Sequence, residues 1–173
     1  ISESATNVLA EAAAKLWPDL DPLLNELAFH RALSRLWEYV RLVNRYVDEV
    51  APWALARDPA QRRQLDTVLY NQVESLRIIG LLLFPFMPYT AASMWRQLGI
   101  QDEIAMQRLA TGMVWGGTHP GTPIQPGEQL FPRIDAGRPL VVAEQTSKVD
   151  LRPTIEATPT TVSYEEFQKL DLR

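Results

Sequence analysis

Cysteine is absent from this chain of 173 residues, which excludes disulfides, thiolate metal sites and cysteine nucleophiles together. Apolar runs are also too short to cross a membrane, because the longest, near residues 78–87, is interrupted by Pro85. The first residues lack the positively charged and then apolar pattern of a secretory leader, so we do not expect secretion. The chain begins with Ile1 instead of methionine, and we therefore expect it to be part of a longer protein.

Catalytic motifs are missing as well. The two histidines, His30 and His119, have no metal-ligand spacing and no nucleophile nearby in the sequence, so we expect both to have surface or capping roles. There is no Gly-rich phosphate loop followed by lysine, no Gly-x-Ser-x-Gly and no His-Glu-x-x-His. Asp48 and Glu49 are adjacent and would point about 100° apart on a helix, which is poor geometry for paired acid–base chemistry. The sequence predicts no catalytic residue, no cofactor site and no metal site in this chain.

Most of the first 111 residues show apolar side chains at helical spacing, and prolines or glycines separate the predicted helices. These helices cover residues 4–17, a short piece from residue 21, and residues 27–50, 59–84 and 88–98. Pro18 is predicted to end the first helix, and Asp21 with Pro22 to start the next as N-cap and first helical residue. The pattern predicts an all-α fold, an antiparallel helical bundle with short connections.

Composition changes after residue 111 and divides the chain into four predicted segments. Residues 1–111 form the helical bundle. Residues 112–135 are rich in glycine and proline and form an irregular wrap that ends in Leu-Phe-Pro-Arg-Ile-Asp. Residues 136–163 have few large apolar groups and are predicted to be a flexible linker, and residues 164–173 open a further unit.

The predicted helix at residues 27–50 is strongly amphipathic. Its apolar residues share one arc at about 100° per residue, and they are Phe29, Ala32, Leu33, Leu36, Trp37, Val40, Val43, Val47 and Val50. Trp37 and Trp95 follow such apolar periodicity and are predicted to belong to the core, whereas Trp115 is predicted to plug the space under the Gly/Pro-rich wrap. The opposite side of the helix carries charged residues, which are Arg31, Arg35, Glu38, Arg41, Arg45 and Glu49.

Charge is distributed unevenly along the chain. The formal net charge of −4 argues against a protein that coats nucleic acid indiscriminately. Residues 31–63 nevertheless carry seven arginines against four carboxylates, a surplus of +3, and no lysine. Arginine forks onto a phosphate and also stacks on a base, which lysine does poorly. Arg41, Arg45 and Arg57 are therefore candidate phosphate contacts, although a solvated helix face would show the same charges.

The long helix ends at a proline corner that carries Trp53. Because a residue that precedes proline disfavours the helical region, the helix is expected to end near Ala51, which puts Trp53 just beyond the last turn. An indole in that place, close to Arg57, is a candidate platform for an unpaired RNA base, and such stacking is worth about 1–3 kcal/mol. The alternative is a buried tryptophan that seals the end of the bundle.

Asn44 and Asp48 lie one turn apart just before this corner, with Asn44 at the edge of the apolar arc. A buried amide must be hydrogen-bonded, or it costs about 1–3 kcal/mol. One hypothesis is that both side chains brace the backbone of the Ala51-Pro52-Trp53 corner, and the other is that they contact a ligand directly. The two hypotheses are compatible, because a braced corner would hold the indole in a fixed orientation.

Between Leu24 and Asp135 the sequence resembles the anticodon-binding helical domain of methionyl-tRNA synthetases. Four segments carry the resemblance, and they are Phe29-His-Arg-Ala-Leu-Ser-Arg-Leu-Trp37, Val43-Asn-Arg-Tyr-Val-Asp-Glu-Val-Ala-Pro-Trp53, Leu83-Phe-Pro-Phe-Met-Pro-Tyr-Thr-Ala91 and Leu130-Phe-Pro-Arg-Ile-Asp135. The third is shared with related class I synthetases, whereas the second and the fourth are closer to the methionine enzymes. Residues 162–173 are similar to the start of the OB-fold tRNA-binding module that many of these enzymes append.

This resemblance implies that Pro52 and Trp53 lie at the anticodon-reading surface, with Trp53 stacked on the first anticodon base. The implied partners are the methionine-specific anticodon loop and the catalytic domain of the same parent chain, in the cytoplasm and away from membranes. ATP with Mg²⁺ would be used by the parent methionine–tRNA ligase, whose catalytic motifs are absent here. The family also reads that base with an asparagine and an arginine on an earlier helix, and no equivalent pair is found before Trp17.

Two other functions are compatible with the same residues. The chain could be a helical scaffold for protein interaction, because tryptophan and arginine are also favoured at protein–protein hot spots. It could also be the anticodon-binding domain of another class I aminoacyl-tRNA synthetase, because part of the sequence resemblance is shared among those enzymes.

Overall fold

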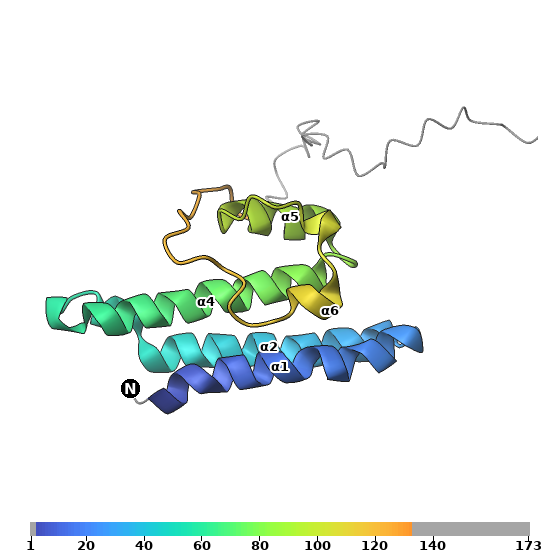
Figure 1. Cartoon of the computed structure of the whole chain (residues 1–173), viewed down its shortest axis with the longest axis horizontal. Coiled ribbons are helices and arrows are strands. Elements are labelled where there is room, and N and C mark those ends of the chain that lie inside the picture. Colours follow the sequence, from blue (N-terminus) through green and yellow to red (C-terminus); the bar gives the residue numbers. More distant parts are fainter. Residues whose placement is uncertain (1–2, 133–173) are drawn as a thin grey trace, which may run out of the picture. The chain divides into compact units, whose positions relative to one another are not determined.

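The computed structural model describes residues 3–132, with side chains from residue 8 onward. Regular structure in this range is helical, in the order α1 (Glu3–Asn25), α2 (Phe29–Val50), α3 (Pro52–Leu55), η1 (Pro59–Gln61), α4 (Arg62–Leu83), α5 (Pro88–Gln97), η2 (Ile104–Met106) and α6 (Leu109–Gly112). Figure 1 shows α1, α2 and α4 running in alternating directions, with α5 on the side of α4 away from α2. The predicted all-α antiparallel bundle is confirmed. The predicted segments 136–163 and 164–173 lie outside the described residues, and the four-part division of the chain stays a prediction.

Helix α1 does not stop at Pro18, so the prediction of a break there is wrong. Both Pro18 and Pro22 lie inside one continuous helix. Each proline lacks the N–H that would bond the preceding turn, a cost of about 3 kcal/mol in a helix interior. The cost is offset by burial, because the apolar face continues without interruption across Pro18 against the rest of the bundle: Leu9, Ala13, Leu16 and Leu20. The uninterrupted spacing of that face was the sequence signal for a single helix.

Helix α2 uses a different face for the core than the apolar arc predicted. Its buried residues are Ala32, Leu36, Tyr39, Val43, Tyr46 and Val50. Trp37 lies about 140° around the helix from the centre of this face at 100° per residue, and its side chain is 47% exposed. The prediction of a core Trp37 is therefore wrong, whereas Trp95 is buried and Trp115 is half-buried against the core, as expected. The predicted apolar arc of α2 was too wide to show which of its residues are buried, because α1 and α4 cover only part of it.

Hydrogen bonds explain why two tyrosines can occupy the core face of α2. The Tyr39 hydroxyl lies 3.1 Å from Ser75 Oγ on α4 and 3.4 Å from the Leu9 carbonyl oxygen on α1. The Tyr46 hydroxyl accepts a hydrogen bond from Asn71 Nδ2 on α4 at 3.2 Å. Burial raises the pKa of Tyr39 to about 12, so the neutral hydroxyl is kept in the core. The two tyrosines thus fix how α2 sits on α4.

The irregular segment after α6 is held to α4 by one buried carboxylate, Glu74, which has no exposed surface. Its two oxygens accept hydrogen bonds from three successive backbone N–H groups, those of Gly116 (2.8 Å), Gly117 (2.9 Å) and Thr118 (3.0 Å). They also accept from the Arg77 guanidinium, at 2.6 Å for the closest pair. Arg77 in turn donates to two carbonyl oxygens of the same segment, those of Gly112 and Val114. Residues 112–118 are therefore attached to α4 by five hydrogen bonds to the side chains of Glu74 and Arg77, without a strand in the described range.

The charge of Glu74 is stabilised in spite of its burial. Burial alone would raise the pKa of this carboxyl, but hydrogen bonds from Arg77, Thr118 and Gly117 and the positive charge of Arg77 outweigh it. The net result lowers the pKa of Glu74 from 4.5 to about 2. Gly117 has no space for a side chain here, because a Cβ atom would lie 2.7 Å from the Arg77 guanidinium carbon.

The helices of residues 3–132 differ from membrane-spanning helices. None of them combines the length and the apolar character that a membrane-spanning helix requires.

We expect Glu74 to make folding sensitive to acid, and Glu74→Gln to remove that contribution. Because the folded pKa lies below the ordinary value, the stabilisation is complete above about pH 4.5 and is lost as the pH falls towards 2. A shift of this size corresponds to roughly 3 kcal/mol. Glu74→Gln should cost about 3–5 kcal/mol at neutral pH, since it leaves Arg77 buried without its counter-charge. Urea unfolding of the full chain at several pH values between about 2.5 and 7 gives the free energy of unfolding of both proteins and so measures both effects. Equal acid sensitivity in the variant and the wild type would contradict this assignment.

Candidate nucleic-acid interface

The corner between α2 and α3 is built by the backbone. Ala51 ends α2 in the left-handed region, with φ 44° and ψ 66°, and Pro52 is the first residue of α3. The Ala51 N–H donates to the Val47 carbonyl oxygen at 3.1 Å, and the Ala51 carbonyl oxygen accepts from the Ala54 N–H at 2.7 Å. A proline at the first helical position needs no N–H partner, and its fixed φ suits the new helix. The chain therefore turns sharply with its backbone groups satisfied.

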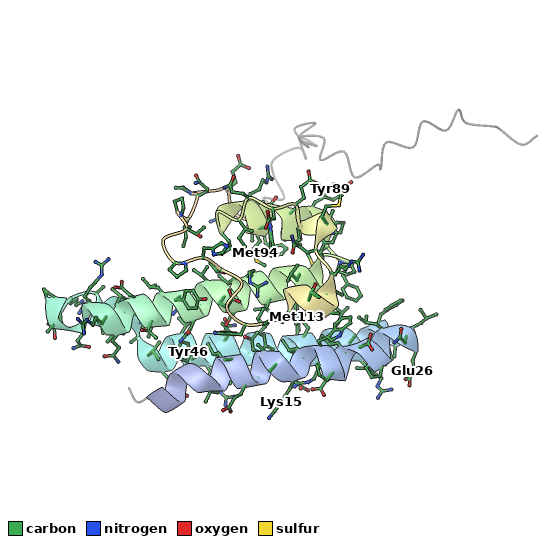
Figure 2. All side chains as sticks on the ribbon, in the orientation of Figure 1. Lys15, Glu26, Tyr46, Tyr89, Met94 and Met113 are labelled. Carbon is green, nitrogen blue, oxygen red and sulfur yellow. The ribbon has the colours of Figure 1, made fainter. Side chains whose placement is uncertain are left out.

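Trp53 projects from this corner into solvent. The single turn of α3 is anchored by Leu55, which is buried and packs α3 on α4, whereas the Trp53 side chain is 56% exposed. The prediction of an open indole at the proline corner is confirmed, and the alternative of a tryptophan sealing the bundle is wrong. Tyr46, labelled in Figure 2, lies near the end of α2 that leads to the corner, where its bond to Asn71 holds α2 on α4. The indole is thus presented by a supported turn.

Asn44 and Asp48 do not brace the corner. Both side chains are exposed, and in the described part of the chain neither makes a hydrogen bond to the backbone at Ala51, Pro52 or Trp53. The bracing hypothesis is wrong because the core face of α2 is rotated away from the predicted arc, which leaves Asn44 on the outer side. Both polar groups are free for a ligand, so the second hypothesis, direct contact, stays a prediction.

The arginines in the first half of α2 have acidic partners, whereas several exposed arginines in the following segment take part in no ion pair of the described residues. Arg31 lies 3.8 Å from Glu26, and Arg35 lies 2.9 Å from Asp19 and 3.1 Å from Glu38. Within residues 3–132 no ion pair involves the exposed Arg41, Arg45, Arg57 or Arg63, whereas Arg62 pairs with Asp66 at 3.0 Å. Unpaired guanidinium groups can bind phosphate without first breaking an internal contact. Arg63 was missed by the sequence analysis, and its only signal was its place in the +3 segment.

Cofactor chemistry has no support among the described residues. No group of three His, Asp or Glu side chains in this range comes close enough together to hold a metal ion. The apolar pocket near the other end of α2 is lined by aliphatic and aromatic side chains, among them Leu20, Leu36 and Phe86, which offer nothing to a phosphate group. His30 and His119 are exposed, as predicted. These residues do not fit ATP or Mg²⁺.

The sequence of this chain is similar to known proteins of one function, as a family model and individual relatives show. Residues 11–113 match the family model described as the anticodon-binding domain of tRNA ligase. The chain is 38% identical over 165 residues to the methionine–tRNA ligase of Caldanaerobacter subterraneus subsp. tengcongensis, covering 95% of this chain and 25% of that protein. It is 33% identical over 175 residues to the methionine–tRNA ligase of Bacillus subtilis, covering 95% of this chain and 26% of that one.

A solved structure supports the same likeness. The apo methionyl-tRNA synthetase of Mycobacterium tuberculosis superposes with a TM-score of 0.68 and 28% identity, over 78% of this chain and 27% of that chain. The chain spans about a quarter of the length of the curated relatives that it matches.

We expect the free energy of unfolding to depend on how well the residue at position 51 tolerates the left-handed conformation of Ala51. In the left-handed region a β-branched side chain is strained, so Ala51→Val should lower the free energy of unfolding by about 1–3 kcal/mol. Ala51→Gly is the matched control, because glycine adopts this conformation freely but loses more entropy on folding, and it should stay within about 1 kcal/mol of the wild type. Urea unfolding of the full chain measures both variants. A valine variant as stable as the alanine protein would show that the left-handed cap is not formed.

Proposed function

Because the chain belongs to the family of tRNA-ligase anticodon-binding domains, in the form that methionyl-tRNA synthetases carry, we propose that it binds the anticodon loop of methionine tRNA through the Trp53 corner. In this proposal the Trp53 indole stacks on the first anticodon base, and Pro52 shapes the turn that presents it. Asn44 and Asp48 contact the loop directly, as polar groups that are otherwise without a partner at this surface. Arg41, Arg45 and Arg57 hold the phosphates of the same strand.

The observation that carries the proposal is an indole more than half exposed at the end of a helix whose last arginines, Arg41 and Arg45, take part in no ion pair among residues 3–132. An exposed tryptophan is costly in water unless something covers it, and a nucleobase matches its flat apolar face. Stacking reads little sequence by itself, so Trp53 would supply affinity while Asn44 and Asp48 supply hydrogen bonds to base edges. Together these groups provide stacking, hydrogen bonding and charge at one end of α2.

The rest of the reaction belongs to the parent ligase, which we propose to be an ATP-dependent methionine–tRNA ligase. One solved relative, from Mycobacterium tuberculosis, is described with bound methionyl-adenylate. We propose that the catalytic part of the parent lies towards the opposite end of α2, about 30 Å from the corner at 1.5 Å per residue. Exposed apolar side chains gather there, namely Leu27, Phe29 and Tyr89. Phe29 also packs edge-on against Phe86, with ring centroids 6.0 Å apart. Charging of tRNA accompanies translation, so we place the protein in the cytoplasm.

We expect Trp53→Ala to weaken binding of a methionine anticodon stem–loop by about 10- to 100-fold, because stacking on an aromatic ring is worth about 1–3 kcal/mol per base. Fluorescence or calorimetric titration of the full chain gives the dissociation constant. Tyr89→Ala is the matched control. This exposed aromatic residue lies in the first turn of α5, at the end of that helix away from the Trp53 corner in Figure 2, and its removal should leave the affinity unchanged. Thermal unfolding should be the same for all three proteins, because both rings are exposed.

The same titration separates the rival functions. Equal binding by the Trp53→Ala variant and the wild type would end the stacking proposal and favour a protein-interaction scaffold. Competition with stem–loops that carry other anticodons tests the methionine assignment. If a different anticodon competes as well as the methionine one, the domain belongs to a synthetase of another specificity.

Salt dependence tests the arginines. If Arg41, Arg45 and Arg57 each contact a phosphate, replacing any one by glutamine should make the plot of log K against log salt less steep by about 0.7. The control is Arg62→Gln, because Arg62 is engaged with Asp66 at 3.0 Å. Affinities measured between about 50 and 300 mM salt, roughly a sixfold range of ionic strength, are sufficient. A variant whose slope equals that of the wild type removes its arginine from the interface.

A further inference from the structure

A second exposed indole lies on the same helix that leads to the corner. Trp37 is 47% exposed on the outer side of α2, although tryptophan is normally covered in a folded domain. Nothing in the helix itself requires a large ring at this position, because α1 and α4 pack on the other side. Of the two exposed indoles, the proposed function uses Trp53 and gives Trp37 no role.

Trp37 starts a polar stripe that runs along α2 to the corner. Residues at spacings of three, four and seven lie on one face of a helix, and every member of this set is exposed: Trp37, Arg41, Asn44 and Asp48. We call these four residues the outer stripe. From Trp37 to Val50, where α2 ends, the helix rises about 20 Å. The outer stripe thus connects the two exposed indoles.

The arginines of α2 differ in their ion pairing before and after Trp37. The arginines before Trp37, Arg31 and Arg35, are paired with Glu26, Asp19 and Glu38. Those after it, Arg41 and Arg45, take no part in an ion pair of the described residues. Two cations without an ion pair among the described residues therefore lie within about two turns after Trp37, and the exposed carboxylates of Asp48 and Glu49 follow them before the corner. This order of charges suits a phosphate strand that passes close to Trp37, Arg41 and Arg45.

The distance decides which part of an RNA could reach Trp37. A strand of B-form DNA advances about 3.4 Å per nucleotide, and an A-form RNA strand somewhat less, so a span of about 20 Å corresponds to at least roughly six nucleotides. With one anticodon base on Trp53, the nucleotide at Trp37 would belong to the stem. There the bases are paired and stacked, so their faces are not available to a protein side chain. What a stem offers is ribose, 2′-hydroxyl and phosphate on the shallow groove of an A-form helix.

The chemistry of Trp37 and Arg41 matches that surface. The indole N–H is a donor only, and phosphate oxygens and 2′-hydroxyl groups accept hydrogen bonds. The guanidinium one turn further along supplies positive charge for the next phosphate. A protein partner would favour a contiguous exposed apolar patch around the ring, whereas the apolar neighbours Leu33 and Val40 are half-buried, and the exposed neighbours of Trp37 towards the corner are arginine, asparagine and aspartate.

We propose that Trp37, together with Arg41, forms a second RNA contact that binds the sugar–phosphate backbone of the anticodon stem. This contact rests on the proposed function, since the RNA must first be placed by Trp53. It deepens that function by extending recognition from the unpaired loop to the duplex behind it. The stem would be recognised by shape and charge, without base reading.

The test compares two RNAs: the complete anticodon stem–loop, and the same loop sequence as a single strand without the stem. For the full chain, Trp37→Ala should weaken binding of the stem–loop by about 5- to 10-fold, the net value of one ordinary hydrogen bond, and should not change binding of the single strand. Trp37→Phe keeps the ring but lacks the N–H donor, and should give an intermediate loss. Trp53→Ala should weaken binding of both RNAs.

The outcomes separate the two proposals. If Trp53→Ala weakens both RNAs and Trp37→Ala weakens neither, the stem contact is wrong and the loop proposal stands. If Trp37→Ala weakens both RNAs equally, the contact is not with the stem. If Trp53→Ala has no effect on either RNA, the proposed function itself fails, and the stem contact fails with it. Circular dichroism of the variants checks that the fold is retained, as expected for an outer residue.

Discussion

Glu74 joins the helical part of the described chain to the irregular part. A segment rich in glycine and proline cannot satisfy its own backbone groups through helix or strand, so their partners must come from elsewhere. Here one carboxylate accepts three successive N–H groups, at residues 116–118, and its partner Arg77 occupies two carbonyl oxygens of the same segment. Removing any member leaves buried groups without partners, so the network is stable only when complete. This requirement makes α4 the central helix, because the same helix also holds α2 through Asn71 and α3 through its contact with Leu55.

The corner that carries Trp53 follows from the position of α4. Its turn is fixed by the backbone conformation of Ala51 and by the buried Leu55, and no polar side chain is used to hold it. Asn44, Asp48 and Trp53 therefore keep their functional groups for a ligand. A site that is rigid before binding loses less conformational entropy when the RNA arrives, and affinity gains accordingly. The small cost of a left-handed alanine is consistent with such a preorganised site.

Local pattern was sufficient for some features and not for others. The end of α2 and the exposure of Trp53 could be predicted, because a proline limits the residue before it whatever the surroundings. The continuity of α1 across Pro18 could not, since packing against α2 and α4 outweighs a local preference. The core face of α2 depends on tyrosine hydroxyls whose partners are 25 or more residues away. Glu74 likewise meets amides 42 to 44 residues later, and the only trace in the sequence was a charged pair in an apolar stretch.

The net charge of −4 and an RNA ligand are compatible because charge acts locally. At physiological ionic strength interactions between exposed charges are screened beyond about 8 Å, so carboxylates on α1 or near α5 have little effect at the corner. Arg41 and Arg45 present two cations that take part in no ion pair of the described residues, about 6 Å apart along α2, and Asp48 is the one carboxylate in the outer stripe. An aspartate accepts hydrogen bonds but repels phosphate, so the strand must place a base or a hydroxyl group there, and its phosphates must lie beside the arginines. Overall negative charge then weakens binding to arbitrary RNA, while the local arrangement favours one position and one orientation of the strand.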